Sequence, residues 1–162
     1  MELSATLSVM LQQEFADLDN TQQMLRAGLR LFTAALLGGL LGFEREAKGK
    51  AAGLRTHMLV TLGAAMFVMP LQMENAEHDA LSRVVQGIAA GIGFLCAGTI
   101  LKGDRCSQIK GLTTSASLWF ATAIGITVGL GHVGTAVLGV LFALIILHAL
   151  PFLERPDKET PR

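Results

Sequence analysis

The chain alternates between long apolar runs and short polar segments, and this alternation predicts its helices. Five runs carry no charged residue: 31–43, 58–73, 84–101, 112–130 and 133–152. A helix on the surface of a soluble protein has a polar face with a period of 3.6 residues, and VGTAVLGVLFALIILHALPFL has none. Strands of transmembrane barrels alternate in polarity from one residue to the next, and these runs do not. The pattern therefore predicts an all-α membrane protein with five transmembrane helices.

The composition agrees with this prediction. Hydrophobic residues make up 51% of the chain and charged residues 16%, whereas soluble domains have about 25% charged residues. A helix needs about 20 residues to cross the hydrocarbon core, so the runs 31–43 and 58–73 require polar neighbours to complete their spans. The alternative, a soluble bundle with a buried helical core, is disfavoured because the runs lack a polar face.

The positions of Lys and Arg predict the topology. Basic residues gather in two loops and the C-terminal tail, as Arg45, Lys48, Lys50, Arg55, Lys102, Arg105, Lys110, Arg155, Lys158 and Arg162. The opposite loops, ENAEHDALSR and GH, contain one Arg and no Lys. By the positive-inside rule, we expect a multi-pass membrane protein with its N-terminus outside and its C-terminus in the cytoplasm. Arg26 and Arg30 lie near the outer end of the first span and fit this topology least well.

One transmembrane domain, residues 26–153, is predicted between two terminal segments. Residues 1–25 form an N-terminal segment on the outer side whose apolar side chains share one helical face, so it is either an amphipathic helix on the membrane surface or a mobile leader. Residues 154–162 are rich in charge and proline. This composition predicts a disordered cytoplasmic tail.

Pairs of glycines four residues apart recur inside the apolar runs. They are Gly38 and Gly42, Gly87 and Gly91, and Gly125 and Gly129. Small residues at this spacing allow close helix packing in lipid. Because a chain with five spans and glycine-rich faces offers such surfaces to other helices, we expect a homo-oligomer, with a dimer favoured. The lipid bilayer and another membrane protein complex are the other partners considered.

The segment GGLLGFEREAKGKAAGLRTHMLV places charges between the first two spans. An ionised side chain at the inner edge of the hydrocarbon either reaches the headgroups or faces the bundle interior and finds a partner. Because a carboxylate gains little from anionic headgroups, we expect Glu44 to face inward and to pair with Arg55.

A second segment resembles the first. GLRTHMLV opens the second span and GLTTSASL the fourth. Thr56 or Thr114 could cap the following helix, and Gly53 and Gly111 would permit a sharp entry. The match is either a repeat of two helical hairpins, followed by a fifth helix, or a chance similarity.

Motifs for catalysis or cofactor binding are missing from the sequence. The chain has no Walker loop, dinucleotide fingerprint or GxSxG motif, and its four histidines and two cysteines are scattered. We therefore expect no enzyme activity, no catalytic residue, no cofactor, no metal site and no nucleic-acid partner.

The segments GFERE, KGKAAGLRTHMLVTLGAAMF, GIGFLCAGTILK and KGLTTSASLWFATAIGITVG resemble successive signatures of the MgtC/SapB family of bacterial inner-membrane proteins. The resemblance covers residues 29–150. It departs at Cys96, where the family more often has Gly, and the chain resembles the short form that lacks a soluble C-terminal domain. The motif positions are Glu44, Arg45, Glu46, Gly53, Leu54, Arg55, Thr56, Gly93, Phe94, Gly98, Gly111, Leu112, Thr113, Thr114 and Trp119.

The resemblance implies a location in the bacterial inner membrane, with residues 1–25 in the periplasm and residues 154–162 in the cytoplasm. It also implies a role in growth under magnesium limitation, virulence, the response to stress and the control of membrane energetics. Two functions fit, a regulatory or interaction protein and a small transporter or channel for Mg²⁺ or protons. Magnesium favours oxygen ligands, including one or two carboxylates, and only Glu44 and Glu46 are placed to serve. The regulatory function is therefore favoured.

Overall fold

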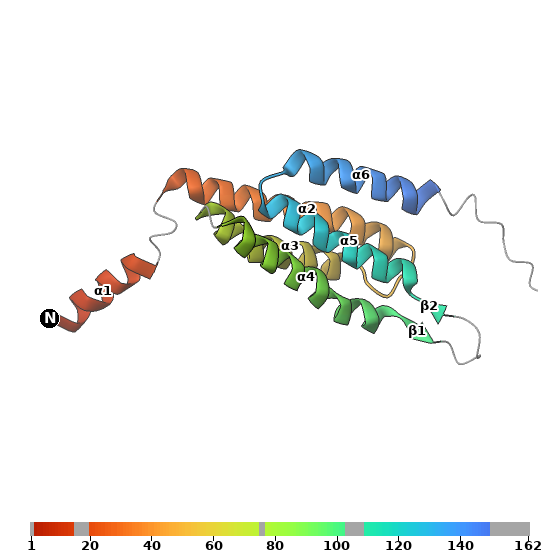
Figure 1. Cartoon of the computed structure of the whole chain (residues 1–162), viewed down its shortest axis with the longest axis horizontal. Helices are drawn as coiled ribbons and strands as arrows, with labels where there is room; N and C mark the ends of the chain where they lie inside the picture. The colour runs from red at the N-terminus through yellow and green to blue at the C-terminus, as the bar shows by residue number, and fades with distance from the viewer. Residues whose placement is uncertain (1, 15–19, 75–76, 103–108, 150–162) are drawn as a thin grey trace, which may run out of the picture.

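Six helices and one short pair of strands form the described part of the chain, which comprises residues 2–14, 20–74, 77–102 and 109–149 of a computed structural model (Figure 1). The elements are α1 (Glu2–Glu14), α2 (Thr21–Ala47), α3 (Leu54–Met73), α4 (His78–Thr99), β1 (Leu101–Lys102), β2 (Ile109–Lys110), α5 (Leu112–Gly129) and α6 (Val133–Ala149). The all-helical prediction is confirmed, and the strands add only an antiparallel pair of two residues each.

Four helices, α2 to α5, are long and apolar enough to cross a membrane. Their positions agree with the first four predicted spans. The fifth predicted run coincides with α6, which has 17 residues. Residues 150–152 of that run lie outside the described residues, so the fifth span stays a prediction.

The N-terminal segment contains a helix, α1, which lies apart from the other helices in Figure 1. Whether α1 rests on the membrane surface stays a prediction. The next helix, α2, begins at Thr21 because the side chain of Asn20 accepts a hydrogen bond of 3.0 Å from the backbone N–H of Gln22, which is the usual geometry of an N-cap. The predicted tail, residues 154–162, lies outside the described residues.

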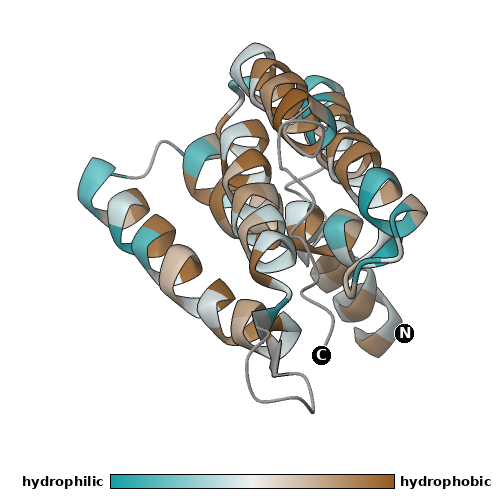
Figure 2. Cartoon of the chain, turned by 90° about the vertical axis from the view of Figure 1, so that its right-hand side faces the viewer, coloured by the Kyte–Doolittle hydropathy of each residue, from teal (hydrophilic) through white to brown (hydrophobic). Residues whose placement is uncertain are grey.

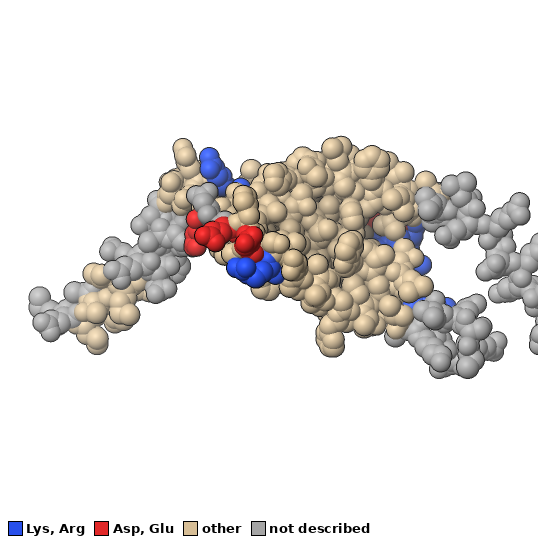
Figure 3. Space-filling model, in the orientation of Figure 1, with Lys and Arg blue, Asp and Glu red and all other residues tan. Residues whose placement is uncertain are grey.

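The helices run up and down through one bundle, and α3 and α5 begin at the same end (Figure 1). We call this the basic end, because it carries Arg45, Lys48, Lys50, Arg55 and Lys110. Figure 2 looks along the bundle from this end and shows apolar ribbon on every helix. On the face shown in Figure 3, charged residues gather toward the two ends and leave a belt of other residues between them. This distribution suits a protein whose middle lies in hydrocarbon.

Glycines bring α2 and α5 against the backbone of α3. A Cβ atom at Gly42 would lie 2.7 Å from the Cα atom of Leu54 in α3, and one at Gly129 would lie 2.8 Å from the carbonyl oxygen of Ala65. Distances this short are not found for real Cβ atoms, so only glycine fits. Gly38 and Gly125 make equally close approaches to α3. Two of the predicted glycine pairs therefore pack helices, and both use α3 as their partner.

The third pair behaves differently. Cβ atoms at Gly87 and Gly91 in α4 would meet nothing within 4 Å. Gly63 on α3 is equally open. The space between α3 and α4 is therefore not filled by the described side chains.

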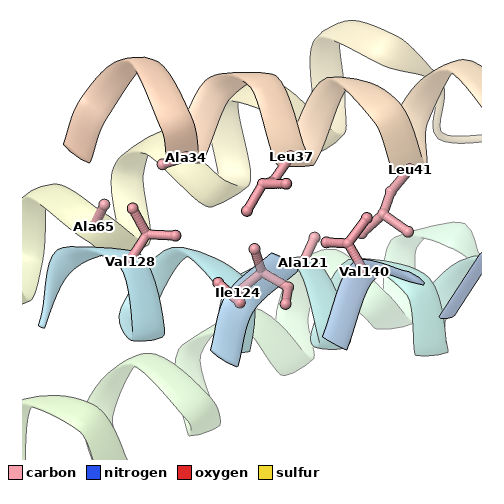
Figure 4. Close-up of a cluster of buried hydrophobic side chains, with 9 residues drawn as sticks. Ala34, Leu37, Leu41, Ala65, Ala121, Ile124, Val128 and Val140 are labelled. Carbon is pink, nitrogen blue, oxygen red and sulfur yellow. The ribbon is translucent and has the colours of Figure 1, made fainter. Parts of the chain in front are cut away.

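Apolar side chains fill the space on the other side of the bundle, between α2, α3, α5 and α6 (Figure 4). Leu37 and Leu41 of α2 point toward α5, which contributes Ile124 and Val128. Val140 attaches α6 to the same cluster. This core packs four of the helices against one another.

Candidate functional site

The end of α2 and the starts of α3 and α5 meet at the basic end, where polar side chains form a set of neighbouring ion pairs and hydrogen bonds. We call it the basic-end network. It consists of Glu44, Arg45, Glu46, Lys48, Gly53, His57 and Ser117. Four of these residues belong to the motif positions predicted from the sequence, and the other three do not.

Glu44 is the centre of charge in this network. Its carboxylate pairs with the guanidinium of Arg45, with Nη2 and Oε1 2.9 Å apart, and with the ammonium of Lys48, with Nζ and Oε1 2.7 Å apart. Glu44 and Arg45 are buried, with 7% and 2% of their surface exposed. Because both charges are removed from solvent, each depends on the other for compensation.

The predicted pair of Glu44 with Arg55 is wrong. Arg55 is exposed, and no other described residue forms an ion pair with it. The reason is the rotation of α3 about its axis. His57 and Thr61 face α2 and are fully buried, and Arg55 lies about 200° away from His57 around a helix of 3.6 residues per turn. Arg55 therefore points away from Glu44.

Lys48 joins α2 to α6. Its ammonium donates a hydrogen bond of 2.6 Å to the backbone carbonyl oxygen of Leu147, in the last turn of α6. The last carbonyl groups of a helix have no partner within it, and they carry a partial negative charge that favours a cation. The ammonium of Lys48 therefore compensates both the negative charge of Glu44 and the partial negative charge at the end of α6.

Glu46 holds the start of α3. Its Oε2 atom accepts a hydrogen bond of 2.8 Å from the backbone N–H of Leu54. Gly53 precedes α3, and a Cβ atom there would lie 3.2 Å from the Cβ of Glu46. The capping group is therefore a carboxylate eight residues earlier in the chain.

The expected threonine caps are wrong. Gly53 and Gly111 occupy the N-cap positions of α3 and α5, and neither helix has a side-chain cap from its own first turn. Thr56 is exposed and Thr114 is buried. The role expected for Gly111 is confirmed, because its φ of 98° is left-handed and a Cβ atom there would lie 2.9 Å from the carbonyl carbon of Thr99. Gly53 has a φ of −108°, so only the close approach of Glu46 requires glycine there.

His57 links α3 to α5 inside the bundle. Its Nδ1 atom lies 2.9 Å from the carbonyl oxygen of Gly53, which can only accept, so Nδ1 carries a proton. Its Nε2 atom lies 3.0 Å from Oγ of Ser117, and that hydroxyl lies 2.8 Å from the carbonyl oxygen of Thr114. In a neutral ring, Ser117 donates to Nε2. In a charged ring, Nε2 donates to Ser117 and the hydroxyl turns to Thr114. Both states have all their partners.

Hydrogen bonds also join α4 to α5 near the basic end. The hydroxyl of Ser115 lies 2.7 Å from the carbonyl oxygen of Cys96 and 2.7 Å from the hydroxyl of Thr99. The thiol of Cys96 donates to the carbonyl oxygen of Ser115 over 3.3 Å. Each helix supplies both donors and acceptors, so the pair is held by more than apolar contact.

Arg30, which fitted the predicted topology poorly, forms hydrogen bonds between helices at the opposite end of the bundle. Its Nη1 atom donates to Oε1 of Gln72 over 2.6 Å and to the carbonyl oxygen of Gly129 over 3.0 Å. The side chain thereby joins α2, α3 and α5. A structural contact explains a basic residue at this position.

The remaining motif residues lie outside the basic-end network. Gly93, Phe94 and Gly98 lie on the exposed surface of α4, and Phe94 has 86% of its surface exposed. Leu112, Thr113 and Trp119 lie on the exposed side of α5. These motif positions therefore lie on exposed surfaces of α4 and α5, away from the packed end of the bundle.

The basic-end network holds helices together, and each of its two carboxylates accepts at least one hydrogen bond from the same chain. Within the described residues, no group of three or more His, Cys, Asp or Glu side chains could hold a metal ion. Glu44 is held by Arg45 and Lys48, and Glu46 by Leu54. The arrangement can fix the positions of the helices, and its histidine can accept a proton.

Sequence reasoning missed Lys48, His57 and Ser117. Lys48 follows Glu44 by four residues, a spacing that brings side chains together on a helix, so this pair could have been found. The contact of His57 with Ser117 joins residues 60 positions apart. It depends on the packing of α3 against α5, which no local pattern encodes.

Comparisons with known proteins agree with these motifs. The model of the MgtC family matches residues 31–156. The chain is 42% identical over 137 residues to SrpB of Synechococcus elongatus, and the aligned region covers 78% of this chain and 75% of SrpB. It is 38% identical over 134 residues, 76% of this chain, to YhiD of Escherichia coli strain K12, whose name suggests a magnesium transporter. It is 41% identical over 113 residues, 70% of this chain, to MgtC of Brucella abortus.

The chain spans 61% of the length of YhiD and 46% of the length of that MgtC. No solved structure matches the chain.

The ion pairs predict how substitutions at the basic end change stability. Glu44→Gln leaves Arg45 buried without a counter-charge and should lower the free energy of unfolding by at least about 3 kcal/mol. Arg55→Gln should change it by less than about 0.5 kcal/mol, because the side chain is exposed. The double variant Glu44→Gln/Arg45→Gln should be more stable than Glu44→Gln alone. Thermal unfolding in detergent measures all three, and a loss in Arg55→Gln equal to that in Glu44→Gln would restore the rejected pair.

Proposed function

Because this chain belongs to the MgtC family, we propose that it is a regulatory protein of a bacterial inner membrane that supports adaptation to magnesium limitation. It acts without catalysis, by binding a copy of itself or another membrane complex through surfaces within the bilayer. The link to magnesium comes from the family. The preference for regulation over transport comes from the basic-end network.

The main support for this proposal is that the carboxylates of Glu44 and Glu46 already bind groups of their own chain. A magnesium site needs oxygen ligands and usually one or two carboxylates. The segments 26–43, 54–73, 80–102 and 109–149 contain no Asp or Glu. At the basic end, Glu44 and Glu46 already bind groups of their own chain. A cation crossing the bundle would find no free carboxylate on these segments.

Transport of a cation is the second candidate, and the name of YhiD favours it. For a proton, His57 is the one buried group of α3 that can change its charge. However, the nearest polar groups toward the opposite end, Thr61 and Thr122, donate to carbonyl oxygens of their own helices. They form no chain of hydrogen bonds across the bundle, so regulation is the better proposal.

The exposed surface of α4 is the proposed site of self-association. Ile92 is the one residue of α4 that is buried, whereas most small residues of the helix face outward. Ala90, Gly93 and Ala97 form a strip on this surface beside Phe94. Small residues let helices approach closely in lipid. A second copy packed on this strip would give a dimer, in which the motif residues Gly93 and Phe94 have a role.

The proposed topology follows from the basic residues. α6 and residues 150–152 complete a fifth span, the basic end lies in the cytoplasm, and α1 lies in the periplasm. The C-terminal tail then shares the cytoplasmic side with residues 48–53 and 103–111.

The regulatory proposal predicts that ion flux and biological function separate. Liposomes that contain the purified chain should show no more Mg²⁺ or proton flux than empty liposomes. In cells that lack the chain, wild type should restore growth at low magnesium. Phe94→Ala should fail to restore it at equal protein level, because it removes a side chain from the interaction surface. Phe142→Ala, which changes an exposed phenylalanine on α6, should restore growth. Saturable flux that Glu44→Gln abolishes would favour the transporter.

The proposed dimer predicts the mass of the protein in nanodiscs. Wild type should have the mass of two copies. Gly93→Leu should yield single copies, because a large side chain prevents close approach. Gly134→Leu on α6 is the matched control, since a Cβ atom at either glycine meets nothing within 4 Å. A single-copy mass for wild type would reject the dimer.

A further inference from the structure

The open space between α3 and α4 is a groove with an unusual lining. Its volume is about 750 Å³, within the range of roughly 300–1,000 Å³ of pockets that hold small molecules. Ala64, Ile92 and Thr122 form a buried floor, and Leu59, Phe67 and Leu95 form exposed walls. The open glycines, Gly63 on one side and Gly87 and Gly91 on the other, keep the groove wide.

One end of the groove carries a positive charge. Arg55 and Thr56 line it at the basic end, and no described residue pairs with the guanidinium of Arg55. The two carboxylates of α2 at this level, Glu44 and Glu46, are bound elsewhere. The other described residues that line the groove are uncharged. The groove therefore combines an apolar channel with a free cation at its mouth.

We propose that this groove binds an anionic phospholipid, with its phosphate at Arg55 and an acyl chain along the groove. An acyl chain is apolar and thin, and it can follow a channel that opens sideways to the bilayer. Basic pockets between transmembrane helices on the cytoplasmic side are suited to lipid headgroups. The site is independent of the regulatory function proposed above, and of the strip on α4 that faces away from the groove.

A second copy of the chain fits this groove less well. In a two-fold dimer with its axis along the membrane normal, both basic ends lie at the same level. Two Arg55 side chains would then approach each other, and the two described carboxylates at that level, Glu44 and Glu46, already accept hydrogen bonds from other groups of their own chain. An anionic headgroup supplies the missing charge. The positive charge of Arg55 therefore favours an anionic lipid over a second copy of the chain in the groove.

Native mass spectrometry of the full chain in detergent tests this site. We expect wild type to retain phosphatidylglycerol more strongly than phosphatidylcholine with the same acyl chains. Arg55→Gln should weaken the binding of phosphatidylglycerol about fivefold, the effect of one basic residue near a membrane surface, and leave phosphatidylcholine unchanged. Arg83→Gln, at the other end of α4, is the control for loss of one charge.

A groove-filling variant tests the acyl chain. Gly91→Leu should weaken the binding of both lipids, whereas Gly134→Leu should weaken neither. Thermal unfolding without added lipid checks that each variant folds, and Gly87→Val is the milder replacement if Gly91→Leu does not. Equal retention of the two lipids by wild type would overturn the proposal, as would unchanged binding of phosphatidylglycerol to Arg55→Gln. A change from dimer to monomer in Gly91→Leu, with lipid binding unchanged, would assign the groove to a second copy.

Discussion

The close approach of α2 and α5 to the backbone of α3 is the constraint on which the rest of the structure depends. Gly38 and Gly42 on one side, and Gly125 and Gly129 on the other, leave no room for a Cβ atom. Between helices in a bilayer there is no hydrophobic driving force, so van der Waals contact and hydrogen bonds hold them. Glycine maximises that contact. A helix that is packed closely on two sides in this way is fixed in one orientation about its own axis.

The rotation of α3 decides which of its polar residues lie inside. His57 and Thr61 point into the bundle. The ring of His57 forms a hydrogen bond with Ser117, and the hydroxyl of Thr61 donates one to the backbone carbonyl oxygen of His57. Arg55 and Leu59 are turned to the groove between α3 and α4. The charges of α2 must then be compensated locally, and Arg45 and Lys48 do so for Glu44. The orientation of α3, which its packing against glycines fixes, thus accounts both for the local ion pairs of Glu44 and for the position of Arg55 outside them.

Much of the fold could be predicted because it follows from patterns within single helices. Charge-free runs give the positions of α2 to α5, and the spacing of Gly38 with Gly42 and of Gly125 with Gly129 indicates close contacts. The partner of each glycine pair could not be predicted, since spacing gives no direction between helices. The third pair, Gly87 and Gly91, has the same spacing and faces an open groove. The sequence also places Glu44 at an inner helix end, but the choice between Arg55 and Lys48 needs the orientation of α3.

Cross-linking of cysteines measures the rotation of α3 directly. In a background where Cys96 and Cys106 are replaced by Ser, the pair Gly39→Cys/Met58→Cys should form a disulfide with a mild oxidant. A Cβ atom at Gly39 would lie 3.5 Å from Cγ of Met58, so the side chains at these two positions are neighbours, as a disulfide requires. The pair Gly39→Cys/Leu59→Cys should remain reduced, because Leu59 lies on the wall of the groove. Cross-linking of the second pair without the first would mean that α3 is turned the other way, and the account of the basic end would be wrong.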